Sequence, residues 1–336
     1  MSLNHSESLD APDMGTSSLP GRILEISVVR SLSRRSNIQG IIRALTHVGV
    51  MILTGIVVYF TSTNLWLMIP AMVVHGFVIV TMFAPMHECV HRTAFATPML
   101  NEVFGWFTGL MSFYNFHFYR HYHTWHHRYT QDPEKDPELS DFKPASVPGY
   151  LSEVIGVHFW PLRPYRFLKL AMGQTKNIPY VPDSARRRIA ISAGLQLTVY
   201  VAAVASILMG QMAAWYYWFL PALLAQPFLR MITLAEHTGC TLGDDGLTNT
   251  RTTLTTLPIR LFMWNMPFHT EHHLYPSIPF HLLPQAHQEL KSRLIHLVPG
   301  YVAAQVEVIQ SFSTGSSSST RPSSSQGSSS STGATA

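Results

Sequence analysis

Charged residues are scarce in this chain. Lys, Arg, Asp and Glu together make up 12% of its 336 residues, about half of the share usual in a soluble globular domain. Hydrophobic residues make up 46%, so the chain lacks the polar surface of a water-soluble fold. This composition excludes an ordinary soluble protein and favours one that is embedded in a lipid bilayer.

Cysteine is scarce as well, since the chain contains only Cys89 and Cys240. Two cysteines do not build a disulfide scaffold. We expect both to be buried small side chains, with metal-bound thiolates as the alternative because each lies near a histidine. The formal net charge is only +4, and no basic stripe interleaved with aromatic residues is present. A nucleic-acid partner is therefore not expected.

Long apolar runs, by contrast, are present and predict membrane-spanning helices. A bilayer core about 30 Å thick needs about 20 helical residues. Four runs have nearly this length: residues 44–61, 65–86, 189–209 and 212–234. A short turn joins the members of each pair, so the sequence predicts an all-α integral membrane fold with four transmembrane helices in two hairpins. A fifth apolar segment, 100–118, contains polar residues and is interpreted as interfacial or re-entrant, with a full span as the alternative.

The placement of arginines predicts how these hairpins are oriented. Arginines precede the first and third runs, and another lies near the end of the fourth. Such positively charged ends face the cytoplasm. Residues 87–187 and 235–300 would then form a cytoplasmic helical cap, and both termini would also be cytoplasmic. A bacterial inner membrane and an endoplasmic reticulum both satisfy this topology.

The rest of the chain flanks a single membrane domain at residues 41–312. Residues 1–40 form a polar segment in which the stretch 23–29 has the apolar spacing of an interfacial helix. Residues 313–336 are mostly Ser, Thr and Gly. Such a composition cannot bury a core, so this tail is predicted to be disordered.

Histidine is abundant, and eight of the 18 histidines fall in three short clusters. The clusters are His87-Glu-Cys-Val-His91, His123-Thr-Trp-His126-His127 and His269-Thr-Glu-His272-His273. Positions i, i+3 and i+4 share one face of a helix, so each cluster can direct its imidazoles at one point. A ninth histidine, His237, follows the fourth apolar run as His87 follows the second. The predicted topology puts all of them on one side of the membrane, which favours a single metal site.

Nine neutral imidazoles exceed the four ligands of one zinc ion, so two metal ions fit the count better. Imidazole binds iron, copper, nickel and zinc alike. Two adjacent irons with an open edge can use dioxygen to remove hydrogen from an unactivated C–H bond, which suits an apolar substrate that enters from the bilayer. Glu88, Glu236 and Glu271 are candidates for hydrogen bonds to the ligands. Asn265, one turn before the third cluster, either reaches the site, for example through a water, or caps its helix.

These motifs resemble the membrane-bound fatty acid desaturase and hydroxylase family over about residues 84–287. The likeness includes Tyr119-Arg120 before the second cluster and the His272-His273-x-Tyr275-Pro276 ending of the third. The stretches at 87–95, 130–137 and 249–253 are most similar to a bacterial branch that includes dihydrorhizobitoxine desaturase. The resemblance implies a di-iron, dioxygen-dependent membrane enzyme with four spans and a cytoplasmic histidine cap.

By matching motif, the resemblance implies nine iron ligands: His87, His91, His123, His126, His127, His237, His269, His272 and His273. Some members of the family place an asparagine one turn before the isolated histidine, where this chain has Thr233. Asn265 is then only a substitute for a water-mediated tenth ligand. The fused haem domain of some relatives is absent, so the expected electron donor is a separate ferredoxin, rubredoxin or cytochrome b5-type protein.

The function expected from these features is a desaturase that introduces a C=C bond into a fatty-acyl or other lipid-like, amphipathic chain. A hydroxylase or ketolase is the alternative, because hydrogen abstraction is common to both and the clusters do not separate them. A membrane zinc receptor or metal transporter is a more distant alternative. Transport favours ionisable residues within the spans, whereas only two histidines, His47 and His75, lie inside them.

Overall fold

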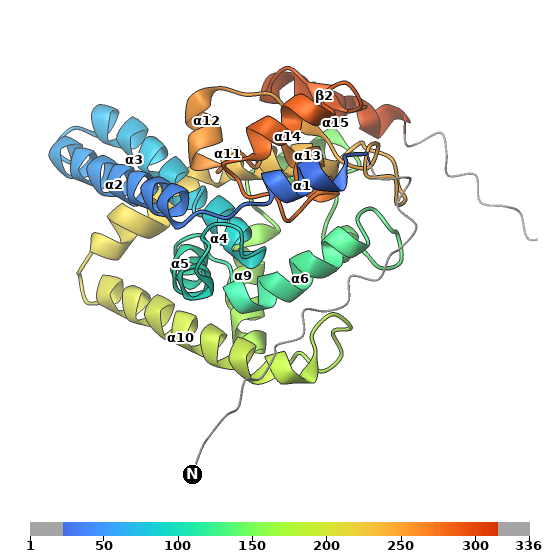
Figure 1. Ribbon diagram of the computed structural model, residues 1–336. Coiled ribbons are helices and arrows are strands. Elements are labelled where there is room, and N and C mark those ends of the chain that lie inside the picture. Colours follow the sequence, from blue (N-terminus) through green and yellow to red (C-terminus); the bar gives the residue numbers. More distant parts are fainter. Residues whose placement is uncertain (1–22, 315–336) are drawn as a thin grey trace, which may run out of the picture.

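The computed structural model describes residues 23–314, and these are almost entirely helical (Figure 1). The prediction of a helical fold is confirmed. The exception within the described residues is a pair of parallel two-residue strands, β1 (Thr252–Thr253) and β2 (Leu297–Val298), which the sequence did not indicate. The last helix, α15 (Tyr301–Thr314), includes the first two residues of the predicted disordered tail. The rest of that tail and residues 1–22 lie outside the described residues.

Four helical segments are long and apolar enough to cross a membrane: Asn37–Thr61, Leu65–Val90, Asp183–Leu208 and Trp215–His237. Helix α2 forms the first segment and α10 the third. The second segment consists of α3 (Leu65–Val80) followed by α4 (Phe83–Val90). The fourth consists of the π-helix η1 (Trp215–Phe219) followed by α11 (Leu220–His237). The four predicted spans are thus present. The helices extend beyond the apolar runs because terminal polar residues interrupt the apolar pattern without ending the helix.

The remaining helices are short. They are α1 (Ile26–Leu32), α5 (Pro98–Met111), α6 (Phe116–Arg128), α7 (Pro137–Ser140), α8 (Val147–Val154), α9 (Phe159–Ala171), α12 (Leu257–Phe262), α13 (His269–Leu274) and α14 (Leu283–Leu290). Two of them, α6 and α13, carry two of the three histidine clusters. The apolar segment 100–118 is divided between α5 and the start of α6. Helix α5 has 14 residues, about 21 Å at helical rise, and is too short for the alternative of a fifth span.

The most extensive contact between helices joins α3 to α11. A glycine permits it: a Cβ on Gly76 would lie 1.9 Å from the carbonyl oxygen of Pro221. Helix α2 packs against α3, as the first predicted hairpin requires, whereas α10 packs mainly against α9 and α11 against α3 (Figure 1). The arrangement as two hairpins and the cytoplasmic side of the cap stay predictions.

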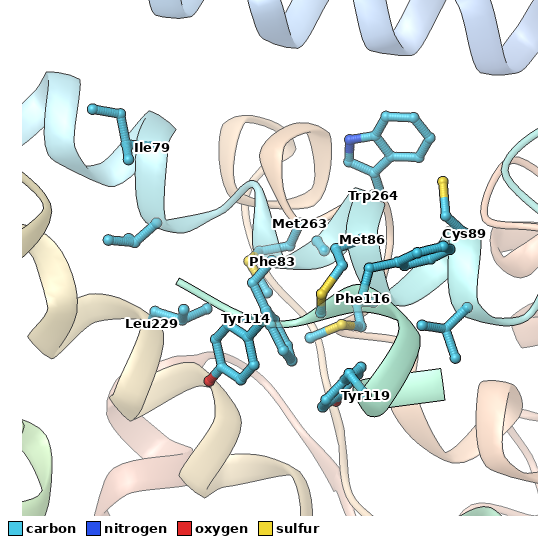
Figure 2. Close-up of a cluster of buried hydrophobic side chains, with 14 of the residues drawn as sticks. Ile79, Phe83, Met86, Cys89, Tyr114, Phe116, Tyr119, Leu229, Met263 and Trp264 are labelled. Carbon is cyan, nitrogen blue, oxygen red and sulfur yellow. The ribbon is translucent and has the colours of Figure 1, made fainter. Parts of the chain in front are cut away.

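A cluster of buried apolar side chains lies where the spans meet the short helices (Figure 2). It combines residues from α4, such as Phe83 and Met86, with Phe116 of α6 and with Trp264, which precedes α13. Full burial of each large apolar side chain contributes about 1.5–3 kcal/mol, so this cluster fixes the relative positions of the three elements. Cys89 belongs to it as a fully buried free thiol, and Cys240 is also free.

Candidate metal centre

Four helices bring the nine predicted histidines to one place. The first cluster lies at the end of α4, where His91 is the C-cap residue, and the second lies along the last turns of α6. The third forms most of α13, and His237 is the last residue of α11. Helix α6 begins at Asn115, whose side chain accepts the backbone N–H of Phe118, a common N-cap arrangement.

The histidines form two adjacent groups. The five-histidine group consists of His87, His91, His123, His127 and His272, whose ring nitrogens all lie within 4.8 Å of one another. The four-histidine group consists of His126, His237 and His273, which satisfy the same limit, and of His269. The Nε2 atom of His269 lies 3.2 Å from that of His237. All nine residues predicted from the sequence therefore converge.

Distances between ring nitrogens fit shared metal ions. In the five-histidine group, His127 Nε2 lies 2.9 Å from His123 Nε2 and 3.1 Å from His272 Nε2. In the other group, His126 Nε2 lies 3.3 Å from His237 Nε2. Two nitrogens that each bind one ion at about 2.1 Å lie about 3.0–3.4 Å apart in octahedral or tetrahedral geometry. The measured separations fall close to that range.

In three of these imidazoles, the Nε2 atom has no hydrogen-bond partner within residues 23–314. The Nε2 atoms of His87, His91 and His273 are buried without a hydrogen-bond partner. A buried polar atom without a partner costs about 1–3 kcal/mol, and three of them in one place call for a common ligand. A donor set composed of imidazoles that point inward is the set that iron, zinc or copper binds. The residues present therefore fit a metal centre.

The electrostatic environment keeps most of these rings neutral. Burial, together with the nearby Arg120 and His126, lowers the pKa of His91 to about 3. Burial and neighbouring imidazoles hold the pKa values of His123 and His272 well below the usual range. The neutral ring is the form that binds a metal ion. Burial also acts against the charged form of His126, but the nearby Glu138 and Asp136 outweigh it and raise the pKa of that ring.

Asp136 orients His126 and was not predicted from the sequence. One oxygen of this buried carboxylate lies 2.9 Å from His126 Nδ1, and the other accepts the backbone N–H of Gln131 at 2.8 Å. The hydrogen bond at Nδ1 fixes the tautomer and directs Nε2 at the metal centre. In the sequence, an acidic residue directly before a proline indicates only a helix N-cap, and Asp136 does cap α7.

Two further contacts fix ligands of the four-histidine group. His237 Nδ1 lies 3.1 Å from the carbonyl oxygen of Asn249, and His273 Nδ1 lies 3.2 Å from the hydroxyl of Thr130. The amide of Asn249 in turn donates to the carbonyl oxygen of Thr130. These positions belong to loops, and no local pattern in the sequence marks them as neighbours of the site.

The three glutamates predicted to form hydrogen bonds to the histidines have different partners in the structure. Glu236 lies at the site, with Oε2 3.7 Å from His269 Nε2. Glu88 instead accepts the backbone N–H of Phe280. Glu271 accepts the hydroxyl of Thr252 and bonds to Nδ1 of His287. Of the three, only Glu236 has a contact with a histidine of the metal centre among the bonds found in residues 23–314.

The amide of Asn265 is occupied by other partners. Its oxygen accepts a hydrogen bond from Arg260 Nε, and its nitrogen donates to the carbonyl oxygen of Phe280. Asn265 also has a left-handed backbone (φ 58°). These bonds give it a structural role in the turn between α12 and α13.

A cavity of about 500 Å³ reaches the metal centre. Its inner wall includes His87, His123 and His269 together with the aromatic rings of Phe83 and Tyr119. Its outer wall is formed by α9 and by the loops around α7, which carry several charged side chains. The cavity is therefore lined both by charged side chains of the short-helix region and by aromatic rings beside the histidines.

Replacement of Asp136 by asparagine is expected to lower metal affinity and turnover about 10- to 100-fold, the usual cost of losing the outer partner of a ligand histidine. The asparagine amide still fills the space and can still cap α7, but it carries no charge to oppose the burial of His126. The metal content of the purified Asp136→Asn protein and its turnover measure the effect. A variant as active as the wild type would show that the bond to His126 is not needed.

Two comparisons with known proteins agree with the resemblance described from the sequence motifs. A family profile for fatty acid desaturases matches residues 64–304, which include all nine histidines. The chain is also 22% identical over 294 residues to the sn-1 oleoyl-lipid 12-desaturase of Picosynechococcus sp., and the match covers 81% of this chain and 80% of that protein.

Proposed function

Because the chain belongs to the fatty acid desaturase family, we propose that it is an O2-dependent di-iron membrane desaturase that introduces a C=C bond into a fatty-acyl or other amphipathic chain. The observation that supports this proposal most strongly is the division of nine inward-pointing imidazoles into two adjacent groups. One ion would be held by the five-histidine group and the other by the four-histidine group. The cavity beside them gives a substrate access.

An iron pair supplies, when bound, the oxidising power to remove hydrogen from an unactivated C–H bond with dioxygen. Overall, dioxygen takes up two hydrogens from the substrate together with two electrons and two protons, and it leaves as two waters. The electrons come from a separate donor of the ferredoxin, rubredoxin or cytochrome b5 type. The protein holds the histidines neutral and oriented, and the aromatic wall of the cavity excludes water from the reacting carbons.

The chain would work in a bacterial inner membrane or an endoplasmic reticulum, with the metal centre at the cytoplasmic surface. The arginines that flank the spans support this orientation by the positive-inside rule. His87 and His237 lie at the ends of two of the membrane-spanning segments, so an apolar chain from the bilayer and a soluble electron donor could both reach the centre.

The charged side chains that line the cavity indicate which polar group the substrate carries. Most cations in its wall are neutralised: Arg166 pairs with Asp141, and Arg230 pairs with Glu153. Arg163 and Lys169 have no such ion pair among the described residues, and Lys169 lies over the ring of Tyr165. Arg163 contacts two aromatic rings. Its guanidinium lies 4.1 Å from the ring centroid of Tyr114 and 4.0 Å from that of Phe159, and the structure gives it no hydrogen bond or ion pair with any residue in 23–314. An anionic group on the substrate, such as a carboxylate, would supply the missing partner.

The Arg163→Gln variant is expected to raise KM for a substrate with a free carboxylate by about tenfold or more, because a hydrogen bond to a charged group contributes about 1.5–3 kcal/mol. Its kcat should change little, since Arg163 is not a metal ligand. Steady-state kinetics on a free fatty acid and on its methyl ester measure the difference. Lys169→Gln, in the same cavity wall, is the control, and equal losses on acid and ester would refute a role for the charge.

Expression of the full chain in a host with a matched electron donor, under labelled dioxygen, tests the proposed function. Lipids and metabolites of this host are compared with those of a host that expresses the His126→Ala variant. We expect a product two hydrogens lighter than its precursor and without labelled oxygen. A product that retains one labelled oxygen atom would assign a hydroxylase or ketolase instead. Zinc in the purified protein and no use of dioxygen would exclude the enzyme.

A further inference from the structure

Glu236 is a largely buried acid whose carboxylate has no cationic side chain as a partner within residues 23–314. Its side chain is only 12% exposed, and its Oε1 atom is buried without a hydrogen-bond partner. Within the described part of the chain, its ion-pair contact is with the ring of His269. Two other buried acids differ from it, since Glu153 pairs with Arg230 and Asp136 accepts three hydrogen bonds.

Such a group is costly unless a positive charge compensates it. Moving an unpaired carboxylate out of water costs several kcal/mol even after the protein relaxes. Lys143, a cation in the same cavity wall, lies 3.8 Å from a different carboxylate, that of Glu138. A cation bound beside Glu236 would supply both a partner for the buried Oε1 atom and a compensating charge.

The position of Glu236 relative to the four-histidine group indicates a metal ion. Its Oε2 atom lies 3.7 Å from His269 Nε2, and His237 Nε2 lies 3.2 Å from the same nitrogen. Adjacent ligand atoms that share one ion at about 2.1 Å lie about 3.0–3.4 Å apart, so a shift of a few tenths of an ångström would bring Oε2 into that range. The four-histidine group also has one imidazole fewer than its neighbour, which leaves room for an oxygen ligand.

We propose that Glu236 is an oxygen ligand of the metal ion in the four-histidine group, on the side that faces the cavity. The inference rests on the proposed di-iron function and deepens it. Glu236 and His269 both line the cavity, so the carboxylate adds one negative charge at the edge where substrate and dioxygen approach. A charged oxygen ligand stabilises the higher oxidation state of that ion relative to the ion held by five imidazoles, and the two ions become inequivalent.

A second carboxylate lies near the same group, but its bonds differ. Glu138 Oε1 lies 4.0 Å from His126 Nε2, and Glu138 forms a group with His123 and His126 that could hold a metal ion. Its other oxygen, however, pairs with Lys143, so this carboxylate already has a counter-charge. We therefore assign the ligand to Glu236.

The test uses the full chain, purified after growth with 57Fe, and measures iron content and the Mössbauer spectrum. For the wild type we expect two irons per chain and two distinct iron signals. The Glu236→Gln variant should bind one of the two irons at least about tenfold more weakly, so that chelator dialysis removes about half of the iron and one signal. Glu134→Gln, an exposed acid in the same cavity wall, should retain both irons and an unchanged spectrum.

A second variant distinguishes loss of a metal ligand from misfolding of the protein. Glu236→Asp keeps the charge on a shorter side chain, so we expect it to retain both irons while one signal shifts. Unchanged spectra and iron content in both Glu236 variants would overturn the inference and leave the proposed function intact. A wild-type protein without iron would instead contradict the proposed function itself, so the two failures are distinguishable.

Discussion

The His126→Ala variant is expected to form no detectable product while it still enters the membrane. His126 binds at the four-histidine group, where its Nε2 atom lies 3.3 Å from that of His237, and its other nitrogen is bonded to Asp136. Loss of an outer partner alone costs about 10- to 100-fold, and loss of the ligand itself should cost more. Product yield and the amount of protein in the membrane fraction are the two readouts.

A histidine outside the metal centre provides the matched control. His158 stacks on Phe142 at 3.9 Å between ring centroids and belongs to neither histidine group. The His158→Ala variant should retain product formation. Alanine substitution of any one of the nine predicted ligands is likewise expected to abolish product formation. Full activity in the His237→Ala variant would show that His237 is not a ligand.

The second large effect is expected at Gly76, far from the chemistry. A valine there would place its Cβ atom within 1.9 Å of the carbonyl oxygen of Pro221, so α3 and α11 must separate. Overpacking of this kind costs about 1–3 kcal/mol and occasionally more. The two segments that carry His87 and His237 near their ends would lose their alignment, and we expect the Gly76→Val protein to lose both thermal stability and iron.

Gly49, on α2, gives the control for that substitution. A Cβ atom added at Gly49 meets nothing within 4 Å, so Gly49→Val changes a membrane-spanning helix without pushing it from a neighbour. Unfolding in detergent and the iron content of both variants measure the difference. Equal stability of the two variants would show that the close approach of α3 and α11 does not hold the metal centre together.

The parts of this structure that depend on local periodicity could be predicted from the sequence. Apolar runs of sufficient length located the four spans, because a lipid environment requires continuous apolar helices. Histidines spaced by three and four residues indicated ligands on one helix face. Both signals lie within single segments, so neither requires knowledge of how distant segments pack.

The division of the histidines into two groups could not be predicted in this way. His123 and His127 belong to the five-histidine group, whereas His126, on the same helix α6, belongs to the other group. A helix turns by about 100° per residue, so neighbouring positions on one face can still contact different ions. Which of the two groups each ring joins depends on the positions of α4, α11 and α13, and these follow from tertiary packing.

The contacts around the ligands depend on packing as well. Glu271 follows His269 by two residues, which turns its side chain to the opposite side of α13, toward Thr252 and His287. The prediction that Glu271 forms a hydrogen bond to a histidine of the metal centre was therefore wrong, because it depended on proximity in sequence alone. Asp136, in contrast, lies ten residues after His126 and reaches it because the chain folds back before α7.

The central claim is that two metal ions share nine imidazoles. Anomalous X-ray scattering at the iron edge, from crystals of the protein purified with its native metal, tests it most directly. We predict two iron peaks, one among His87, His91, His123, His127 and His272 and one among His126, His237, His269 and His273. A single peak, or scattering at the zinc edge in place of iron, would contradict the account.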